Sequence, residues 1–318
     1  MPILKKYQFF WIKKKFPILS RFWYFFKGTY PLSLAKLNLK LKARNPKTFT
    51  QKILHKMAYD RNPNMTLFAD KARVKEFIKA RVGEEYVIKT FLVVETLVGL
   101  KQGDFPRNFV VKANNGSGAS VIVWEGAPAT NMLPRHVNIS EAWKTYQIHP
   151  DSLNFELLTK MADGWMKQNY YYFPGKFPEW AYLNIKPLIV FEELQLDKTG
   201  KIPSDFRFYM FHGKCKLIQV EFDSYGVHTR NFYSEEFEKL DVTQMYPNNI
   251  NGIEKPIELD EMFRVSERLS EDADFLRVDF YLTLNGLKVG ELTNYPLGGG
   301  QKFSPKSFGK HLGRHLDI

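Results

Sequence analysis

The feature that most narrows the fold of this chain is a loop of small residues between two apolar segments. Residues 109–111 and 121–124 predict two strands, and the chain from Lys112 to Ser120 reads Lys-Ala-Asn-Asn-Gly-Ser-Gly-Ala-Ser. Small side chains let consecutive backbone N–H groups approach a phosphate, and the lysine adds a positive charge. Both the P-loop and the Rossmann loop lead into a helix, whereas a strand follows here. The segment predicts a phosphate-binding hairpin, with an ordinary flexible hairpin as the alternative.

A second polar position follows a short apolar strand. Residues 188–191 are Leu-Ile-Val-Phe, and Glu192 and Glu193 come directly after them. A carboxylate at the exit of a buried strand needs a partner or a solvent-exposed edge. One of these two is placed to accept a hydrogen bond from an adenine amine or a ribose hydroxyl, and a solvated strand end is the alternative.

The third polar position is a hairpin near the end of the chain. Arg277 and Asp279 share one face of its first strand. The turn at Asn285-Gly286 permits two registers: a two-residue turn puts Glu291 on the opposite face, and a three-residue loop pairs Asp279 with Glu291. In the second register the carboxylates suit a magnesium ion that also binds substrate phosphates. The alternative is a structural ion pair between Arg277 and Asp279.

Strands and helices are interleaved along the chain, with several hairpins. Helices are expected over 67–82, with Asp70 as the N-cap, and near 139–148, 154–168 and 257–270. Further strands are expected over 206–211 and 217–222, and the last hairpin over 275–284 and 287–293. This order favours an α+β fold with largely antiparallel sheets and argues against a doubly wound parallel sheet.

The positive charge is concentrated in one segment. The net charge is +12, yet residues 1–59 hold 14 of the 46 Lys and Arg and no Asp or Glu, which leaves 32 basic and 34 acidic residues in the rest. Nucleic acid is therefore not an expected partner. The segment is also rich in Phe and Trp, which suits contact with an anionic membrane surface. Packing of these rings on the protein body is the alternative.

The remaining composition is typical of a soluble globular protein, with 44% apolar and 25% charged residues. The single cysteine, Cys215, excludes an internal disulfide framework and suits a reducing cytosol. No apolar run in residues 1–59 is long enough to span a membrane. We therefore expect a cytoplasmic protein. If residues 1–59 bind lipid, it would be peripheral on the inner face of the membrane.

Taken together and in this order, the segments resemble the TupA-like ATP-grasp family, named for teichuronopeptide biosynthesis, within the ATP-grasp superfamily. The resemblance extends from about Asp60 to Leu312. Its motifs in this sequence are Asp70-Lys71, Phe109 to Lys112 with Asn114 and Gly116 to Gly118, Tyr170 to Tyr172, Ile185 to Pro187, Glu192-Glu193, Asp205 to Arg207, Phe211 to Lys214, Arg230 to Tyr233, Arg277 to Asp279, Gly290 to Thr293 and Tyr295-Pro296.

The resemblance implies an ATP-grasp fold, in which two α+β subdomains clamp ATP. Residues 1–59 would be a basic aromatic segment, and 60–105 the N-terminal part of the catalytic domain. Residues 106–195 would form the small subdomain with the lid and hinge, and 196–318 the large subdomain with the magnesium and acceptor sites.

The resemblance also implies roles for individual residues. Those expected to bind ATP are Lys71, Lys112, Asn114, Gly116, Ser117 and Gly118 around the phosphates, and Glu192, Glu193 and Leu194 at the hinge. Asp279 and Glu291 are expected to hold Mg²⁺, with Thr293 or Asn294 as a third ligand, because Thr293 stands where many relatives carry Asn. Arg277 is expected to stabilise the oxyanion of a tetrahedral intermediate, with Lys112 as the second catalytic residue. Candidates for acceptor binding are Arg207, His228, Arg230, Gly298 and Gly299, with Arg207 standing where the family often has Lys.

By the same resemblance, the expected activity is ATP-dependent carboxylate–amine ligation through an acyl phosphate. It would attach an amino acid or amine to a uronic acid or a similar carboxylate of a bacterial cell-surface polysaccharide. Two other functions stay open. A glycosyltransferase would use Asp272-Ala-Asp274 as its metal motif, and a non-enzymatic peripheral membrane protein would use residues 1–59 and bind no ATP.

Overall fold

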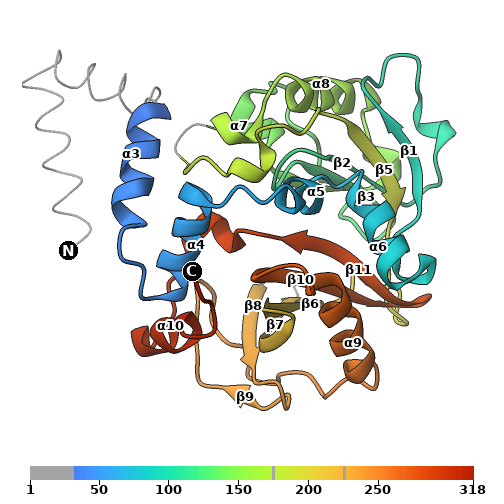
Figure 1. Ribbon diagram of the computed structural model, residues 1–318. Helices are drawn as coiled ribbons and strands as arrows, with labels where there is room; N and C mark the ends of the chain where they lie inside the picture. Colours follow the sequence, from blue (N-terminus) through green and yellow to red (C-terminus); the bar gives the residue numbers. More distant parts are fainter. Residues whose placement is uncertain (1–31, 174–175, 225–226) are drawn as a thin grey trace, which may run out of the picture.

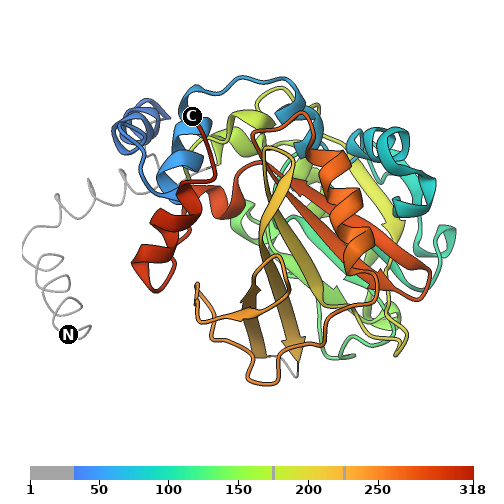
Figure 2. The same cartoon turned by 60° about the horizontal axis from the view of Figure 1, so that its bottom comes forward.

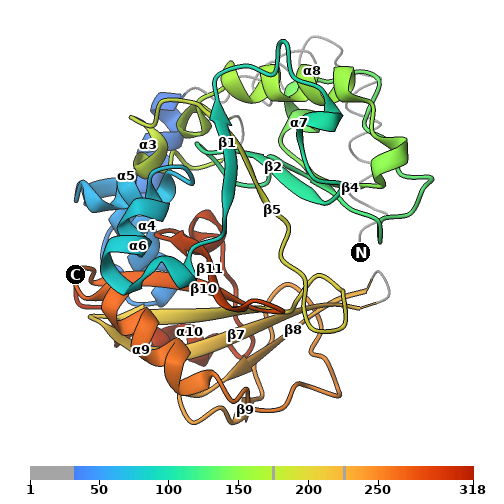
Figure 3. The ribbon, with the colours of Figure 1, turned by 90° about the vertical axis from the view of Figure 1, so that its right-hand side faces the viewer.

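The chain forms two lobes, each built on one sheet. A computed structural model describes residues 32–318 except 174–175 and 225–226. The small sheet has the strand order β1-β5-β2-β3-β4 and the large sheet β11-β10-β6-β7-β8-β9. Figure 3 shows the small sheet above the large one. Every strand pair is antiparallel except β3 with β4. The predicted α+β class with largely antiparallel sheets is confirmed.

The small sheet is covered by one amphipathic helix. Its strands are β1 (Thr90–Val94), β2 (Phe109–Ala113), β3 (Ser120–Val123), β4 (Thr145–Ile148) and β5 (Ile189–Glu193). Helix α8 (Phe155–Met166) begins at Asn154, whose side chain accepts a hydrogen bond from the backbone N–H of Leu157. Its Leu158, Met161 and Trp165 are fully buried against the sheet. The short helix α7 (Ile139–Ala142) packs beside α8.

The large sheet has one apolar and one largely polar face. Its strands are β6 (Asp205–Phe211), β7 (Lys214–Ser224), β8 (Val227–Tyr233), β9 (Lys239–Leu240), β10 (Phe275–Thr283) and β11 (Gly286–Thr293). Helix α9 (Leu259–Ser270) covers the apolar face (Figure 2), where Phe206, Phe208 and Val278 are buried with Met262 and Val265. Because strand side chains alternate, Asp205, Arg207, Arg277 and Asp279 point to the other face, which faces the small lobe.

Two helices near the N-terminus belong to the protein body. Helices α3 (Leu32–Lys42) and α4 (Phe49–Tyr59) pack on each other, and α4 also contacts α10 (Lys306–Gly313). Thr48 and Gln51 form a capping box at the start of α4, and Phe49 and Ile53 are fully buried. Residues 1–59 are therefore not one surface segment: residues 1–31 lie outside the described part, and 32–59 fold with the rest. No helix within the described residues has the length and apolar character to cross a membrane.

The boundaries predicted for the next part of the chain need correction. In place of one helix over 67–82, the structure has α5 (Asn64–Ala69) and α6 (Val74–Val82). The turn between them forms because the Asp70 carboxylate accepts hydrogen bonds from the N–H groups of Ala72 and Arg73. Helix α5 contacts β11 of the large sheet, and α6 contacts α9. Because β1 joins the small sheet, residues 60–105 are divided between the lobes. The helix expected near 139–148 ends at Ala142, and β4 follows, parallel to β3.

Candidate active site

The hairpin of β10 and β11 brings Asp279 and Glu291 to paired positions. The turn pairs Thr283 with Gly286, which differs from both expected turns, and a β-bulge near Gly290 then shifts the register by one residue. The shift aligns Asp279 with Glu291. A Cβ at Gly290 would lie 2.5 Å from the Tyr281 ring, so only glycine fits at the bulge. The predicted pairing is present, but the bulge produces it instead of the turn.

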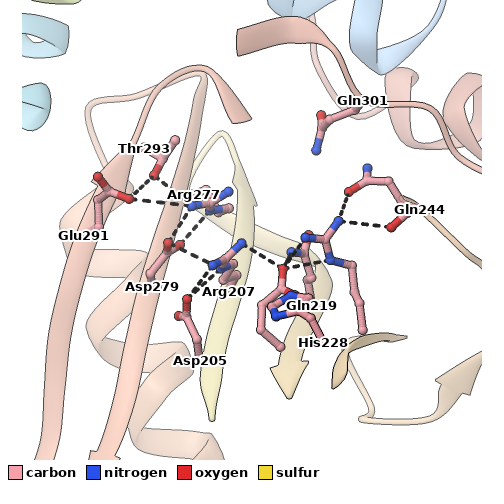
Figure 4. Close-up of polar contacts among 12 residues, drawn as sticks. Asp205, Arg207, Gln219, His228, Gln244, Arg277, Asp279, Glu291, Thr293 and Gln301 are labelled. Carbon is pink, nitrogen blue, oxygen red and sulfur yellow. Dashed lines mark hydrogen bonds and ion pairs between the residues drawn. The ribbon is translucent and has the colours of Figure 1, made fainter. Parts of the chain in front are cut away.

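Each of these carboxylates has a cationic partner (Figure 4). Arg277 donates from Nε and Nη2 to the two oxygens of Asp279, at 2.7 and 2.5 Å. Lys71 Nζ lies 2.9 Å from an oxygen of Glu291. Burial opposes ionisation of Glu291, but Lys71 and Arg277 outweigh it and lower the pKa of that carboxyl to about 2. Burial raises the pKa of Asp279, and the two neighbouring arginines, Arg277 and Arg207, oppose that rise.

The oxygen donors at this position fit a magnesium ion that arrives with a nucleotide. Within the described residues, no group of three or more His, Cys, Asp or Glu side chains could hold a metal ion. Two carboxylates on paired strands are what a magnesium ion with substrate phosphates requires. Thr293 Oγ lies 3.4 Å from Glu291, on the same strand face, and accepts from Arg277 at 3.1 Å. Asn294 instead donates its amide to the carbonyl of Met65, so Thr293 is the one of the two that faces the carboxylates.

A network of ion pairs continues across the polar face of the large sheet. Arg207 donates to Asp205 at 2.6 and 2.8 Å and to Glu221 at 2.8 Å. Glu221 also accepts from Arg230 at 2.7 Å and lies 2.5 Å from His228. Burial opposes ionisation of Glu221, but the arginines outweigh it and lower its pKa. Arg230 is buried and its guanidinium is bound to Glu221 and Gln244, so it supports the face from within and has no donor directed at the cleft.

The lid loop, residues 114–120, uses its asparagines to fix its own backbone. The Asn114 side chain donates to Asp70 and to the carbonyl of Lys186, and accepts from the N–H of Leu188 at 2.7 Å. Asn115 donates to the carbonyl of Gln168. Both side chains are fully buried, so neither faces a phosphate site. Ser117 and Gly118 are exposed, and Gly118 has a φ of +89°.

Gly116 is held under two aromatic rings. A Cβ at this position would lie 2.1 Å from Trp143 and 2.9 Å from Tyr170. Its carbonyl accepts a hydrogen bond of 2.8 Å from Lys71 Nζ. Lys71 therefore joins the lid to Glu291 of the large sheet. The aromatic run around Tyr170 packs inside the small lobe, where Tyr170, Trp143 and Tyr182 make ring contacts.

Glu192 anchors two lysines at the hinge. Its oxygens lie 2.5 Å from Lys112 Nζ and 2.8 Å from Lys75 Nζ, and the side chain is buried. Burial opposes its ionisation, but the lysines outweigh it and lower its pKa. Its carboxylate is thereby occupied, unlike that of Glu193, which contacts only Gln195 among the described residues. A cavity of about 200 Å³ lies beside the hinge, lined by Val110, Ile122, Leu194, Pro203 and Tyr281 among others.

The sequence as a whole matches a family model described as TupA-like ATPgrasp over residues 51–317. The chain belongs to the TupA-like ATP-grasp family. The match begins before and ends after the stretch of resemblance noted in the sequence, and it includes every residue singled out there as a site residue. No curated protein matches the sequence significantly.

Solved ATP-grasp structures resemble this family member only distantly. They include the Bacillus anthracis D-alanine–D-alanine ligase complexed with ATP (14% identity, TM-score 0.37, covering 72% of this chain and 54% of that one). They also include the ATP-grasp ligase PsnB complexed with a precursor variant, Mg and ADP (10%, 0.40, 80% and 61%) and the ADP complex of PurK, N5-carboxyaminoimidazole ribonucleotide synthetase (10%, 0.40, 73% and 46%). The chain thus spans about half the length of these proteins.

The main cleft of this ATP-grasp protein lies between the lobes, with a volume of about 470 Å³. It is lined by Ser117 of the lid, by Arg207, Arg277, Glu291 and Thr293 of the large sheet, and by Gly298 of the 3₁₀ turn η6 (Pro296–Gly299). Gly299 does not line it: a Cβ there would lie 2.6 Å from Leu54, so this glycine permits close packing on α4.

Sequence analysis missed two residues that lie between the lobes. Lys75 lies four residues after Lys71, and both reach the space between the lobes, where burial lowers the pKa of Lys75. The four-residue spacing from Lys71 was the sequence signal that could have identified Lys75. Glu179, in the loop before η5 (Trp180–Tyr182), lines the main cleft, and no motif pointed to it.

The metal motif of the alternative glycosyltransferase is engaged elsewhere. Asp272 forms an ion pair with Arg81, and Asp274 with the buried Lys56. Neither aspartate lines the main cleft. The two carboxylates therefore fasten the start of β10 to helices α4 and α6, and no observation favours that function.

Proposed function

We propose that this protein is an ATP-dependent carboxylate–amine ligase that works through an acyl phosphate. The observation that carries the proposal is the position of Lys71, whose ammonium group bonds both the lid carbonyl of Gly116 and the carboxylate of Glu291. Lys71 thus joins the lid to Glu291, the member of the carboxylate pair that lines the main cleft together with Ser117 of the lid. This is the combination that a phosphoryl transfer needs, because positioning and charge neutralisation do most of the work in that reaction.

The nucleotide would lie with its adenine in the cavity beside the hinge. Val110 and Ile122 of the small sheet and Tyr281 of the large sheet would contact the two faces of the base. Because Glu192 is bound to lysines, the backbone of Glu193 and Leu194 is the better source of hydrogen bonds to adenine. Lys112 and Lys71 would then lie along the phosphates, beneath the lid.

The carboxylate substrate would bind in the main cleft next to Arg277 and Gly298. Asp279 and Glu291 would hold Mg²⁺, which supplies charge neutralisation for the phosphates when bound. Arg277 is held by Asp279, so its guanidinium is fixed in place to stabilise an oxyanion. Lys112 is oriented by Glu192 in the same way.

For the acceptor we propose a uronic acid or similar carboxylate of a bacterial cell-surface polysaccharide, joined to an amino acid or amine. The resemblance to teichuronopeptide enzymes supports this choice. Arg207 and Arg277 at the cleft suit an anionic acceptor. We further propose a cytoplasmic location with residues 1–31, which are basic and aromatic, contacting the inner membrane surface.

The test is ADP release by the purified protein with ATP and Mg²⁺, against a panel of amino acids and uronic acids. We expect release that requires both a carboxylate and an amine and that is lost in Lys112→Ala and Asp279→Asn. Lys160→Ala, on the exposed face of α8, is the matched control and should behave like the wild type. Absence of ADP release with every pair, together with no ATP binding by calorimetry, would overturn the proposal.

A further inference from the structure

Glu179 is a buried carboxyl group that has no partner among the residues the structure describes. Its side chain is 7% exposed, and it lines the same cleft as Arg277, Glu291 and Gly298. Within the described part of the chain no hydrogen bond or ion pair reaches its carboxylate. A Cβ at Gly298 would lie 3.1 Å from one of its oxygens, so the carboxylate lies against the backbone of η6. Buried carboxylates are normally paired, which makes this group a candidate for binding a cationic ligand.

The cations nearest to Glu179 are engaged by other groups. Lys71 is bound to Glu291 and to the carbonyl of Gly116, and Lys176 to the hydroxyl of Tyr170. Both lysines favour the ionised form of Glu179 from a distance, and Glu291 opposes it. Burial outweighs the lysines and raises the pKa of Glu179 to about 8. The cleft therefore contains a carboxyl group that can exchange a proton near neutral pH.

The walls around Glu179 suit an ammonium group. Four aromatic rings line the same cleft: Tyr170, Phe177, Tyr182 and Tyr295. The electron-rich faces of such rings attract cations, more strongly where water is excluded. An anion within an aromatic enclosure is a common way to bind a protonated amine, whereas Arg207 and Arg277 at the large sheet suit an anionic substrate.

We propose that Glu179 binds the ammonium group of the incoming amine and accepts its proton, so that the free amine can attack the acyl phosphate; this inference rests on the proposed ligase function. A protonated amine has no electron pair for attack, and its pKa of about 8 to 10 keeps it protonated at neutral pH. Glu179 in its ionised form takes that proton. A pKa near that of the ammonium group makes the transfer nearly balanced in energy.

Amide formation from a protonated amine releases two protons from the nitrogen. Glu179 accepts the first and the departing phosphate accepts the second. The ammonium group gives one proton to Glu179, its nitrogen forms the C–N bond, and the C–O bond to phosphate breaks with its electron pair on the phosphate. The nitrogen then loses its second proton to the departing phosphate. The protonated Glu179 releases its proton to solvent when the product leaves.

Hydroxylamine separates the two halves of the reaction, because it is a nucleophile that is largely unprotonated at neutral pH. With ATP, Mg²⁺ and the carboxylate that supports ADP release, it converts an acyl phosphate to a hydroxamate without a base. In Glu179→Gln we expect hydroxamate formation within about twofold of the wild type and amide formation reduced by about 10² or more. Glu156→Gln, an exposed change of the same kind on α8, should alter neither.

The outcomes distinguish this inference from the proposed function. No hydroxamate with the wild type would overturn both. Equal loss of hydroxamate and amide in Glu179→Gln would show that Glu179 serves acyl phosphate formation, and unchanged amide formation would show that it serves neither step; each result overturns only the inference. As a second variant, Glu179→Ala leaves space for a small acid, and added formate should restore amide formation at least tenfold. Failure of formate to do so, with hydroxamate formation intact, would also count against a base at this position.

Discussion

The lid loop and the polar face of the large sheet border the same cleft but are built in opposite ways. In the lid, the side chains of Asn114 and Asn115 point into the protein and hold the backbone in shape. On the sheet, the buried Asp279 holds Arg277 through two hydrogen bonds, and Arg277 lines the cleft with Glu291. The lid thus offers backbone N–H groups, whereas the sheet offers charged side chains.

This difference predicts which substitutions each region tolerates. On the sheet, a change that keeps shape but removes charge should abolish function, because the charge is what acts. In the lid, a change that keeps polarity but adds volume should be the harmful one, because the backbone path depends on close packing. The predictions below test this contrast from the largest expected effect to the smallest.

The largest effect is expected from Asp279→Asn. The side chain is 3% exposed and binds Arg277 through both oxygens, with Arg207 Nε at 3.7 Å. The amide keeps the volume but leaves two guanidinium groups without their shared anion and removes one of the two proposed magnesium ligands. We expect ADP release to fall on the order of 10²–10³-fold. Asp241→Asn, at an exposed position, is the control, and more than a tenth of wild-type activity in Asp279→Asn would contradict the assigned role.

The second effect concerns stability and pH at Glu179. Its pKa is raised from 4.5 to about 8 in the folded protein, so the folded state binds more protons than the unfolded state between these values. The stability of the wild type should therefore fall as pH rises through this window. Glu179→Gln removes this dependence, and its advantage over the wild type should grow by on the order of 5 kcal/mol as pH rises from 4.5 to about 8.

Chemical denaturation at a series of pH values measures that advantage. Lys176, Lys71 and Glu291 face the group, together with Tyr170, Tyr182 and Tyr295, whose hydroxyls stay protonated in this range. Glu156→Gln should show a difference from the wild type that does not change with pH. A constant difference for Glu179→Gln as well would mean that this carboxyl is ionised in the folded protein at neutral pH.

Gly116→Ala should have the next largest effect. The added methyl group would lie 2.1 Å from the Trp143 ring, so either the ring or the lid must move. Overpacking of this kind costs about 1–3 kcal/mol of unfolding free energy. Gly103→Ala is the matched control, since a Cβ there meets no atom within 4 Å. Thermal unfolding measures the difference, and equal melting temperatures for the two variants would mean that the lid is not held by its packing.

The sequence predicted the charged residues of the site better than it predicted their surroundings. Asp279 and Glu291 were candidates for a pair because side chains alternate along strands and a hairpin brings two strands together, although the expected turns left two registers open and the observed turn is neither of them. The bulge near Gly290 that aligns them was not predictable, because it depends on Tyr281 filling the space where a Cβ would lie. Asn114 was expected to bind ATP because its position in the loop was all that the sequence showed. Its three structural hydrogen bonds connect it to residues far apart in the sequence, which a local motif does not reveal.

Glu179 shows the same limit most clearly. No motif marks it, because the cleft around it is completed by residues distant in the sequence, among them Tyr295 and Gly298, both more than a hundred positions away. For residues 1–59, charge suggested membrane contact and packing on the protein body was the alternative; residues 32–59 pack on the body. Phe49, Ile53 and Met57 recur at helical spacing there, and that spacing indicates a buried face.

The smallest effect separates the two candidates for a third metal ligand. Thr293 faces Glu291, whereas the Asn294 amide is bound to the carbonyl of Met65. Thr293→Val keeps the volume and removes one hydroxyl, so we expect activity to fall threefold to tenfold, roughly the value of one hydrogen bond of about 1 kcal/mol. The magnesium concentration for half-maximal activity should rise in this variant. Asn294→Ala should lower the melting temperature and leave the magnesium requirement of the folded enzyme unchanged. If Asn294→Ala raised that requirement and Thr293→Val did not, Asn294 would be the third ligand. The polar face of the sheet would then extend past the end of β11, and Asn294 would have to leave the carbonyl of Met65 to reach the metal.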